Sequence, residues 1–445
     1  MLEIYIPVNF TSEREYAIKC LFGVLLGIKY EIRKHNNHNY RIVLPNEREI
    51  IFEDHFFSAI NENAGYLNQI NIPVNISFIC ENEFTNDIIP LIFGINRITI
   101  DPDTTLQIGW DIFASSFFML TRWEEYVQEI RDEHGRFPGT SSLASRHNFL
   151  NRPVVNEYAE ILWKLISHLG YKGERIKREF RIIPTHDIDH LKYWSIEKKR
   201  SLFKNLISDL LIRKNFVLAF SRINSYFNSS IGRRDPYDTF NYLIEKADSI
   251  GTKASFYFIT GGVTVYENHY SANSREVREI IRNINHLGHR TGIHPSYEAY
   301  NNESLLLQEL SVLSEISGSQ ISEGRNHYLR FEVPFSWQLF QKSGLKIDSS
   351  IYYSDLPGFR CGICNEFPVF DILNREILDL YERPLIVMDT SFKNKEPEAV
   401  KNDILELKDT VKKYNGDFVF LWHNSKIDAP EWIKYKKSFE KAFYG

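Results

Sequence analysis

Cysteine is scarce in this sequence: 445 residues include only Cys20, Cys80, Cys361 and Cys364. So few thiols in so long a chain exclude a disulfide framework, which agrees with a reducing compartment. Cys361 and Cys364 form a lone CxxC in the run CGIC, and the lack of a second pair argues against a zinc knuckle. We expect ordinary packing thiols, with a redox role as the alternative.

Long apolar runs and an excess of positive charge are also missing. The apolar stretches are too short and interrupted to span a bilayer, and the first residues, MLEIYIPVNF, lack the basic and apolar regions of a signal peptide. The formal net charge is -5 and the pI about 6.3, which does not indicate a general nucleic-acid binder. We therefore expect a cytoplasmic protein that binds no nucleic acid.

Apolar residues are plentiful, at 43% of the chain, which is enough for more than one domain core. Residues 1–175 mix short predicted strands with two long predicted helices, which begin at Asp111 and Val154. We expect a smaller α+β or α/β domain here, of unknown role. The charged run YKGERIKRE, residues 171–179, is typical of a linker, so a second domain is predicted over 180–445.

The second part contains seven short β-rich runs, separated by stretches long enough to cross back over a sheet. The runs begin at Arg181, Lys253, His289, Asn326, Leu345, Glu376 and Asp417. This alternation predicts a parallel α/β domain, either open or closed into a barrel. Polar side chains follow the runs at the edge where such folds build active sites, namely Asp187, Asp189, His294, Arg330, Asp348 and His423.

Asp187 and Asp189 lie in THDIDH, directly behind the apolar run RIIP. Residues two apart on a strand point the same way, so the two carboxylates converge. Their repulsion is relieved if one carboxylate binds a divalent metal and the other stays free as a base. A surface pair at a turn is the alternative.

His294 is the next candidate ligand, in RTGIHPSYEAY. The proline after it favours an extended conformation, which suits a ligand at a strand end. Glu298 lies four residues further on, and at helical spacing it would share a face with His294 and bind the same ion.

Arg330 and His423 follow later runs of the same domain. Arg330, in HYLRFEVP, is a permanent cation that would hold Asp187 ionised and oriented, unless it pairs with Glu332 or Glu323 instead. His327 in that run faces either the site or the outer helices. His423 ends the run FVFLWHNS and is suited to protonating a leaving group.

Residues 348–371 form a long stretch rich in aromatic residues and glycine, which favours a pocket-lining loop. Arg360 is its expected ligand contact. Ser349 and Tyr297, which follow strand ends, are further candidate substrate-binding residues.

A basic helical insertion is predicted at about residues 195–235. Residues 192–234 contain ten Lys or Arg and two acidic residues, and the apolar residues of 201–220 have helical spacing. A basic amphipathic helix of this kind can lie on an anionic membrane surface. The alternative is a helix packed on the domain with its basic face in solvent.

These motifs together resemble the polysaccharide deacetylases of the NodB-homology family, carbohydrate esterase family four, over residues 180–430. The resemblance depends on the motifs THDID, GIHPSY, YLRFEVP and LWHNS. The first part of the chain, which contains WDIFASSFFMLTRWEEY, resembles an N-terminal domain of uncharacterised function that precedes such domains. The resemblance implies a distorted seven-stranded (β/α) barrel that binds a divalent metal. It further implies Asp187 as the base, Asp189 and His294 as metal ligands, Arg330 as the residue that orients the base, and His423 as the acid.

One departure affects the metal ligands. Glu298 stands where the family has its second metal histidine, so the third ligand is Glu298, His190, His186 or no protein group. The expected cofactor is a divalent ion, with zinc first.

The function that follows is removal of N-acetyl groups from an amino sugar of a surface polysaccharide or its precursor. A cytoplasmic location would favour a nucleotide-linked or lipid-linked precursor as the carbohydrate substrate, and the insertion would suit the lipid-linked form. The alternatives are hydrolysis of another C–N bond in a small molecule, and a glycan-binding protein with a decayed site.

Overall fold

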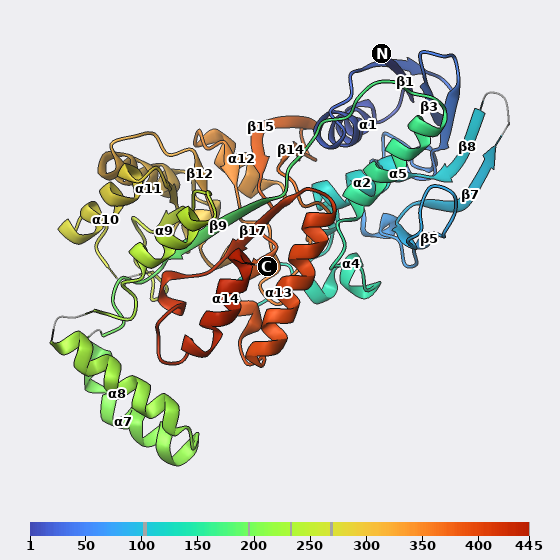
Figure 1. Cartoon of the computed structure of the whole chain (residues 1–445). Coiled ribbons are helices and arrows are strands. Elements are labelled where there is room, and N and C mark those ends of the chain that lie inside the picture. Colours follow the sequence, from blue (N-terminus) through green and yellow to red (C-terminus); the bar gives the residue numbers. More distant parts are fainter. Residues whose placement is uncertain (101–104, 195, 232–233, 268–269, 445) are drawn as a thin grey trace.

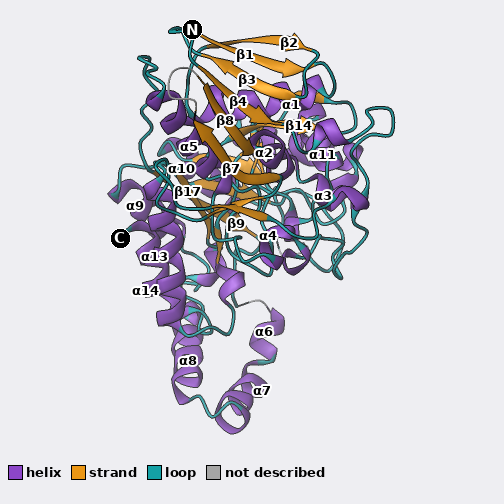
Figure 2. Ribbon diagram, turned by 90° about the vertical axis from the view of Figure 1, so that its right-hand side faces the viewer, coloured by secondary structure: helices purple, strands orange, loops and turns teal. Residues whose placement is uncertain are grey.

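The first half of the chain builds a mixed six-stranded sheet. The computed structural model describes residues 1–100, 105–194, 196–231, 234–267 and 270–444. The strand order is β2-β1-β3-β4-β8-β7 (Figure 2). The strands are β1 (Leu2–Pro7), β2 (Tyr30–His35), β3 (Asn39–Val43), β4 (Glu49–Glu53), β7 (Gly94–Ile100) and β8 (Thr105–Trp110). A separate antiparallel pair is formed by β5 (Ser77–Ile79) and β6 (Ile89–Leu91).

Five helices belong to this half. They are α1 (Thr11–Ile18), α2 (Ile112–Thr121), α3 (Trp123–Val127), α4 (Leu143–Arg146) and α5 (Val154–His168). The strands bury alternate residues, as expected for a sheet with one covered face, and Phe113 of α2 packs against Tyr40 and Phe52 on that face. Asp111 caps α2 by accepting from the backbone N–H of Ala114, so the helix begins where the sequence predicts.

The second half builds a nine-stranded sheet with the order β14-β15-β13-β12-β11-β10-β9-β17-β16. All neighbours in it are parallel except β14 and β15. The strands are β9 (Arg181–Ile188), β10 (Ser255–Phe258), β11 (Arg290–Ile293), β12 (Glu323–Gly324), β13 (Ile347–Asp348), β14 (Phe367–Asp371), β15 (Glu376–Glu382), β16 (Val387–Met388) and β17 (Asp417–Leu421). Helices around it are α9 (Phe240–Ser249), α10 (Arg275–His286), α11 (Glu303–Ser317), α12 (Phe335–Lys342), α13 (Pro397–Lys413) and α14 (Lys436–Phe443).

This architecture is mixed α/β, as expected, but it differs in detail from a seven-stranded barrel. The sheet has nine strands, and among the described residues no strand pairing joins β14 to β16. The run NHYLRFE is also not a strand. Its residues His327–Leu329 form a 3-10 turn in which Tyr328 and Leu329 have positive φ angles of 59° and 53°. Strand β12 instead ends two residues before Asn326.

The two sheets are joined by a shared core. Helices α1 and α2 lie between them (Figure 1), and Tyr16 of α1 and Phe117 of α2 both pack against Phe370 of β14. One cluster of buried apolar residues extends from Leu2 to Phe443. The two halves therefore contact each other through buried side chains.

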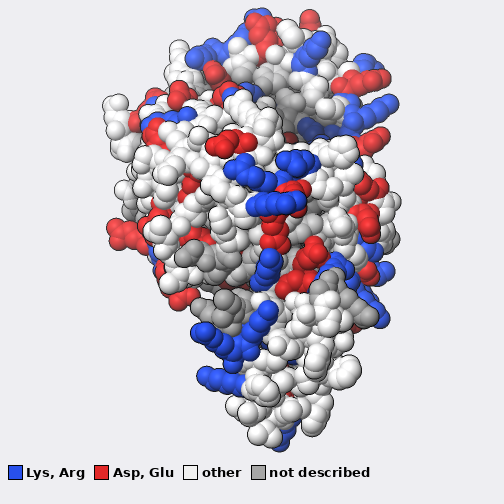
Figure 3. All heavy atoms as spheres, turned by 90° about the vertical axis from the view of Figure 1, so that its left-hand side faces the viewer, with Lys and Arg blue, Asp and Glu red and all other residues white. Residues whose placement is uncertain are grey.

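A helical hairpin protrudes from the second half (Figures 1 and 2). It consists of α6 (Ile196–Arg200), α7 (Leu202–Ile207), a π-helical turn (Ser208–Ile212) and α8 (Phe216–Ser230), at the position of the predicted insertion. Figure 3 shows this protrusion largely free of charge, with Lys and Arg gathered mostly at its base. No helix among the described residues is both long and apolar enough to cross a membrane.

Candidate metal and active site

Strand β9 positions the two aspartates of THDIDH. It lies in the middle of the sheet, between β17 and β10, and its last residues are buried. Asp187 lies within the strand and Asp189 just past its end. One oxygen of Asp187, Oδ1, accepts a hydrogen bond of 2.9 Å from Nη1 of Arg325, which leaves Oδ2 on the side of His294 at 3.7 Å.

Arg325 is the arginine that holds Asp187. It follows β12, its side chain is fully buried, and its guanidinium lies over the ring of Tyr257 at 4.8 Å. Besides Asp187, it donates to Thr185 Oγ1 and to the carbonyl and hydroxyl oxygens of Ser349, at 2.8 to 2.9 Å. Because these acceptors surround the guanidinium, the orientation of Asp187 is fixed from several sides.

Arg330, the predicted partner of Asp187, lies elsewhere. It donates to the carbonyl oxygens of His134 and Tyr297 and stacks on the rings of Tyr297 and Tyr300. The prediction assumed that NHYLRFE is a strand ending at Arg330, and the 3-10 turn removes that premise.

Three side chains converge beside Asp187: Asp189, His294 and His327. Their ligand atoms all lie within 4.8 Å of one another. Asp189 Oδ1 is 3.4 Å from His294 Nε2 and 3.7 Å from His327 Nδ1, and the two ring nitrogens are 2.9 Å apart. His294 follows β11, and His327 opens the 3-10 turn after β12, so both rings come from the same edge of the sheet.

The hydrogen bonds of the two rings fix which nitrogens are free. His294 Nδ1 is 2.5 Å from the carbonyl oxygen of Arg325, and His327 Nε2 is 3.3 Å from that of Tyr266. A carbonyl oxygen only accepts, so these nitrogens carry the protons. The other two nitrogens then direct lone pairs at each other, and a cation or one additional proton between them relieves the repulsion.

The charge balance of this cluster favours a cation. Burial lowers the pKa of His327 to about 4. Burial also opposes protonation of His294, but the charges of Asp187 and Asp189 outweigh it and raise that pKa. Burial would raise the pKa of Asp189, yet His423, His294 and His327 hold it well below its usual value. A carboxylate and two imidazoles with lone pairs facing one point are a common donor set for zinc.

The fit to a metal can be tested on the distances. Ligands about 2.1 Å from a tetrahedral ion lie roughly 3.4 Å apart, close to the 3.4 and 3.7 Å measured from Asp189 Oδ1. That oxygen is buried and has no hydrogen-bond partner in the structure. An unpartnered buried oxygen costs free energy, and a bound ion would remove that cost.

The structure does not place Glu298 or His190 among these ligands. The Glu298 side chain is 59% exposed and lies 3.9 Å from Arg330. His190 lines the cavity, but its ring packs 5.8 Å from that of Tyr237. His186 is buried against the carbonyl oxygen of Trp422, where burial lowers its pKa to about 4. The third candidate ligand is thus His327, whose direction the sequence left open.

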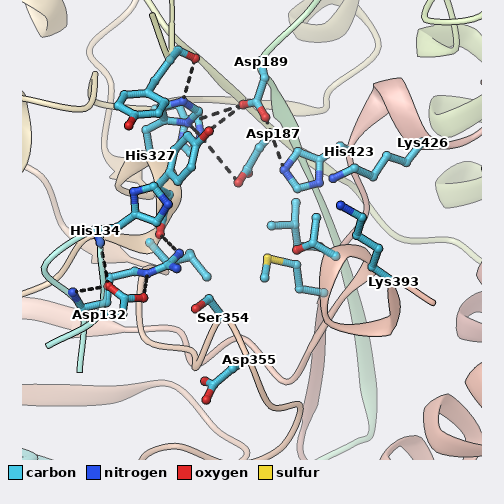
Figure 4. Close-up of a pocket in the computed structure, with 18 of the residues that line it drawn as sticks. Asp132, His134, Asp187, Asp189, His327, Ser354, Asp355, Lys393, His423 and Lys426 are labelled. Atoms are coloured by element: carbon cyan, nitrogen blue, oxygen red, sulfur yellow. Dashed lines mark hydrogen bonds and ion pairs between the residues drawn. The ribbon is translucent and has the colours of Figure 1, made fainter. Parts of the chain in front are cut away.

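On the opposite side of Asp189 lies His423, just past β17. Its Nε2 is 3.5 Å from Asp189 Oδ2 (Figure 4), while its Nδ1 lies 2.9 Å from Asp389 Oδ2. Asp389 also accepts from the His423 backbone N–H and from Lys426. Burial would raise the pKa of Asp389, but His423 and Lys426 lower it, so a carboxylate orients the imidazole.

Asp389 was not identified from the sequence. It follows β16, which has only two residues, Val387 and Met388. The apolar run LIVM before it ends in a carboxylate, and this pattern, the same as at Asp187, would have been the signal.

A cavity of about 660 Å³ opens over these residues. Figure 4 shows Asp187, Asp189, His327 and His423 gathered at one end, with Asp132, His134 and Asp355 at the other. Asp132, His134, Arg136 and Pro138 come from the first half of the chain, in the loop after α3. Arg136 donates to the carbonyl oxygen of Tyr328 at 2.8 Å, which fastens this loop to the wall of the cavity.

The three predicted substrate contacts have other surroundings. Arg360 is buried and paired with Glu125 of α3, and it donates to the carbonyl oxygen of Tyr352. Ser349 is buried and holds Arg325. Tyr297 stacks on Tyr266, which does line the cavity, and its hydroxyl lies 3.0 Å from His134 Nδ1.

Ser354 and Asp355 of the predicted pocket-lining loop do line the cavity, whereas the part of the loop that carries Arg360 packs into the core. Cys361 and Cys364 are buried free thiols, and burial raises the pKa of both. This agrees with the expectation of packing residues.

Comparison with known proteins gives a family for the first half only. Residues 2–171 match the model of a family described as a family of unknown function, DUF7033. No curated protein matches the chain.

Solved structures resemble part of the chain weakly. A protein named as a polysaccharide deacetylase from Mycobacterium smegmatis is 15% identical, with 60% of this chain and 82% of that chain covered and a TM-score of 0.36. A family 4 carbohydrate esterase from Streptomyces lividans, in complex with acetate, is 10% identical, with coverage of 60% and 88% and a TM-score of 0.28.

A pseudoenzyme of the same carbohydrate esterase family from Bacillus anthracis is 9% identical, with coverage of 59% and 61% and a TM-score of 0.29. Likenesses this weak decide nothing about activity, all the more because a pseudoenzyme is among them. The chemistry depends on the side chains of the site.

Proposed function

We propose that the chain is a metal-dependent hydrolase that removes the acetyl group from an N-acetylated amino sugar. One observation carries the proposal. Around a single cavity, a buried carboxylate and an oriented imidazole lie on either side of a three-residue metal ligand set, Asp189, His294 and His327. Amide hydrolysis needs these three functions together: a base, an electrophilic centre and an acid.

Asp187 is the proposed base. Arg325 engages its Oδ1 and leaves Oδ2 toward the ligand set, where an attacking water would lie. The guanidinium donates to one oxygen of the carboxylate and leaves the other to accept the proton of that water. Ser349 and Thr185 hold Arg325 and so contribute to this orientation indirectly.

A divalent ion, with zinc first, would be held by Asp189, His294 and His327, where it would lower the pKa of a bound water toward about 7 and polarise the amide carbonyl. The two imidazoles are already oriented for this by the carbonyl oxygens of Arg325 and Tyr266.

His423 is the proposed acid. Its Nδ1 faces Asp389, which leaves Nε2 on the cavity side as the nitrogen from which a proton would be transferred. The departing amine must gain a proton, since otherwise the tetrahedral intermediate returns to the amide. Asp389 stabilises the imidazolium form that donates it.

The rest of the cavity suits a sugar. Tyr266 and Tyr328 offer aromatic faces, and His134 from the first half lies against both rings. Polar groups at the far end, Asp132 and Asp355, are within the same cavity and would bind hydroxyl groups. The first half therefore contributes to the proposed substrate site.

Acetate release tests the proposal. The purified protein, with its metal measured, is assayed on N-acetylated amino-sugar oligomers, nucleotide-linked N-acetyl sugars and lipid-linked N-acetyl sugars. Asp187→Asn should lower kcat/KM by about 10² to 10⁴-fold without loss of metal, and Asp379→Asn, at a side chain that is 79% exposed, serves as the control. Equal activity of Asp187→Asn and wild type would overturn the assignment of the base.

A further inference from the structure

The outer surface of the helical hairpin, residues 198–231, is unusually apolar for exposed structure. Eleven of the thirty-one exposed large apolar side chains among the described residues lie between Phe203 and Ile231. Four of them are phenylalanines, Phe203, Phe216, Phe220 and Phe227, each exposed by 61 to 79%. Single exposed apolar residues are ordinary, but a contiguous set marks an interaction surface.

Helical spacing places much of this set on one face. Phe216, Phe220, Ile223 and Phe227 follow each other at intervals of four, three and four residues on α8. Val217, which is 80% exposed, lies beside this face and lines a groove toward the second half of the chain. Side chains at these intervals project from one side of a helix, so the exposed rings form a continuous stripe.

The opposite side of the hairpin is well packed, so this exposure is not that of an unfolded segment. Asp209 is fully buried and accepts from Arg213 and Arg222 at 2.7 and 2.9 Å. Arg222 also donates to Tyr193 at the base of the hairpin, and Trp194 donates to Ser225. These contacts fix the hairpin to the rest of the second half of the chain, while the apolar stripe of α8 faces outward.

The charges of the hairpin are mostly positive. Between residues 196 and 231 the sequence has seven Lys or Arg and two acids, Glu197 and Asp209, and Asp209 is buried. Lys199, Arg200, Lys204 and Lys214 are exposed. Figure 3 shows this distribution as blue groups around a largely uncharged protrusion.

We infer that the hairpin docks on a membrane surface rich in anionic phospholipid, with the stripe of α8 in the interface and the basic side chains at the headgroups. Apolar insertion beside an excess of cations is the combination that such a surface binds. A second copy fits less well, because two hairpins in contact would bring positive charges together.

The hairpin lies close to the proposed active cavity, so docking on a membrane would bring the cavity near the lipid surface. A groove of about 560 Å³ lies between the hairpin and the catalytic half, with Arg213, Val217 and Leu218 on one side and Trp432 on the other. Lys393 lines both this groove and the proposed active cavity. If the proposed function holds, on which this step depends, the substrate is a glycan carried on a membrane lipid, with its anionic link near Lys393.

Vesicle binding tests the docking without any assay of activity. The full-length protein is sedimented with vesicles of phosphatidylcholine alone or mixed with phosphatidylglycerol, at low and high salt. We expect binding only to the anionic vesicles, weakened by salt. Phe216→Ser combined with Phe220→Ser should weaken binding at least about tenfold, whereas Ile70→Ser with Val74→Ser, exposed by 85 and 80% elsewhere, should not.

A second pair of variants, Lys204→Glu with Lys214→Glu, tests the charges without touching the stripe and should weaken binding by about tenfold or more. Equal binding of neutral vesicles, or unchanged binding by both hairpin variants, would overturn the proposal. So would a dimer in sedimentation that the Phe variants abolish, since a second copy would then cover the stripe. Release of acetate from a water-soluble N-acetylated oligomer should be unchanged in these variants, which separates a failed docking from a failed function.

Discussion

Several clusters of charged side chains are buried in this molecule, and two of them differ in kind, one between α3 and the loop before β14 and the other at the end of β9. In the first, Arg122 and Arg360 meet Glu124 and Glu125, and each carboxylate oxygen accepts a hydrogen bond. In the second, Asp189 Oδ1 has no hydrogen-bond partner and two imidazole lone pairs face each other.

The difference separates a structural cluster from a functional one. Buried charges that satisfy one another join the two halves of the chain and leave nothing to bind a ligand. Buried polar groups that lack a hydrogen-bond partner cost free energy unless a ligand binds them. At the end of β9 the proposed ion would be this ligand. Burial and charge alone would not have distinguished the two, because both clusters are almost inaccessible to solvent.

The largest expected effect comes from His423, whose proposed role belongs to the functional cluster. His423→Asn should lower kcat/KM for acetate release by about 10² to 10⁴-fold, because the leaving amine loses its proton donor. Metal content and the unfolding midpoint should stay near those of wild type, as measured by elemental analysis and urea denaturation. An active His423→Asn protein would remove the acid from the mechanism.

The matching change in the structural cluster should affect stability instead. Arg360→Met removes the cation that Glu125 meets from the second half, and should lower the free energy of unfolding by about 3 kcal/mol, read from urea denaturation. Arg330→Met is the control, since it loses hydrogen bonds to carbonyl oxygens and should cost about 1 kcal/mol. If Arg360→Met has the same free energy of unfolding as wild type, the ion pair between Arg360 and Glu125 does not stabilise the fold.

An effect of similar size on stability should appear as the pH is lowered. Burial would raise the pKa of Glu125, but Arg360 and Arg122 outweigh it and lower the pKa from 4.5 to about 2. A depressed folded-state pKa stabilises the protein above the unfolded value, and this stability is lost as the pH falls from about 4.5 toward 2. The difference in unfolding free energy between wild type and Glu125→Gln should shrink over that window by roughly 3 kcal/mol. A constant difference between pH 5 and 2 would contradict the ion pair.

The sequence predicted the fold best where strands are long. Runs at β9, β10, β11, β15 and β17 were recognised from apolar composition, and the helices from Asp111 and Val154 begin where expected. Strands β12, β13 and β16 have two residues each, too few to show any periodicity, and of these only β13 lies in a predicted run. The sequence indicates a loop at β14. The strand is buried there by Tyr16, which is some 350 residues away in the sequence, and no local pattern reveals such a contact.

The residues of the site also fall into two groups, those that the sequence predicted and those that it did not. Asp187, Asp189, His294 and His423 follow long or clearly apolar strands, and the structure brings all four together. Arg325 and His327 follow the two-residue strand β12 and Asp389 follows the two-residue strand β16, and of the three only Asp389 had a signal in the sequence, the apolar run before it. Arg360 shows the converse error, since a cation in a Gly-rich loop is typical of a ligand contact but here neutralises Glu125.

Metal content tests the central claim most directly, because it distinguishes the ligand set seen in the structure from the set expected from the sequence. Wild type and Glu298→Ala should both bind about one equivalent of zinc, while His327→Ala should bind far less, as measured by elemental analysis after equilibrium dialysis. Loss of zinc from Glu298→Ala with retention by His327→Ala would contradict the account.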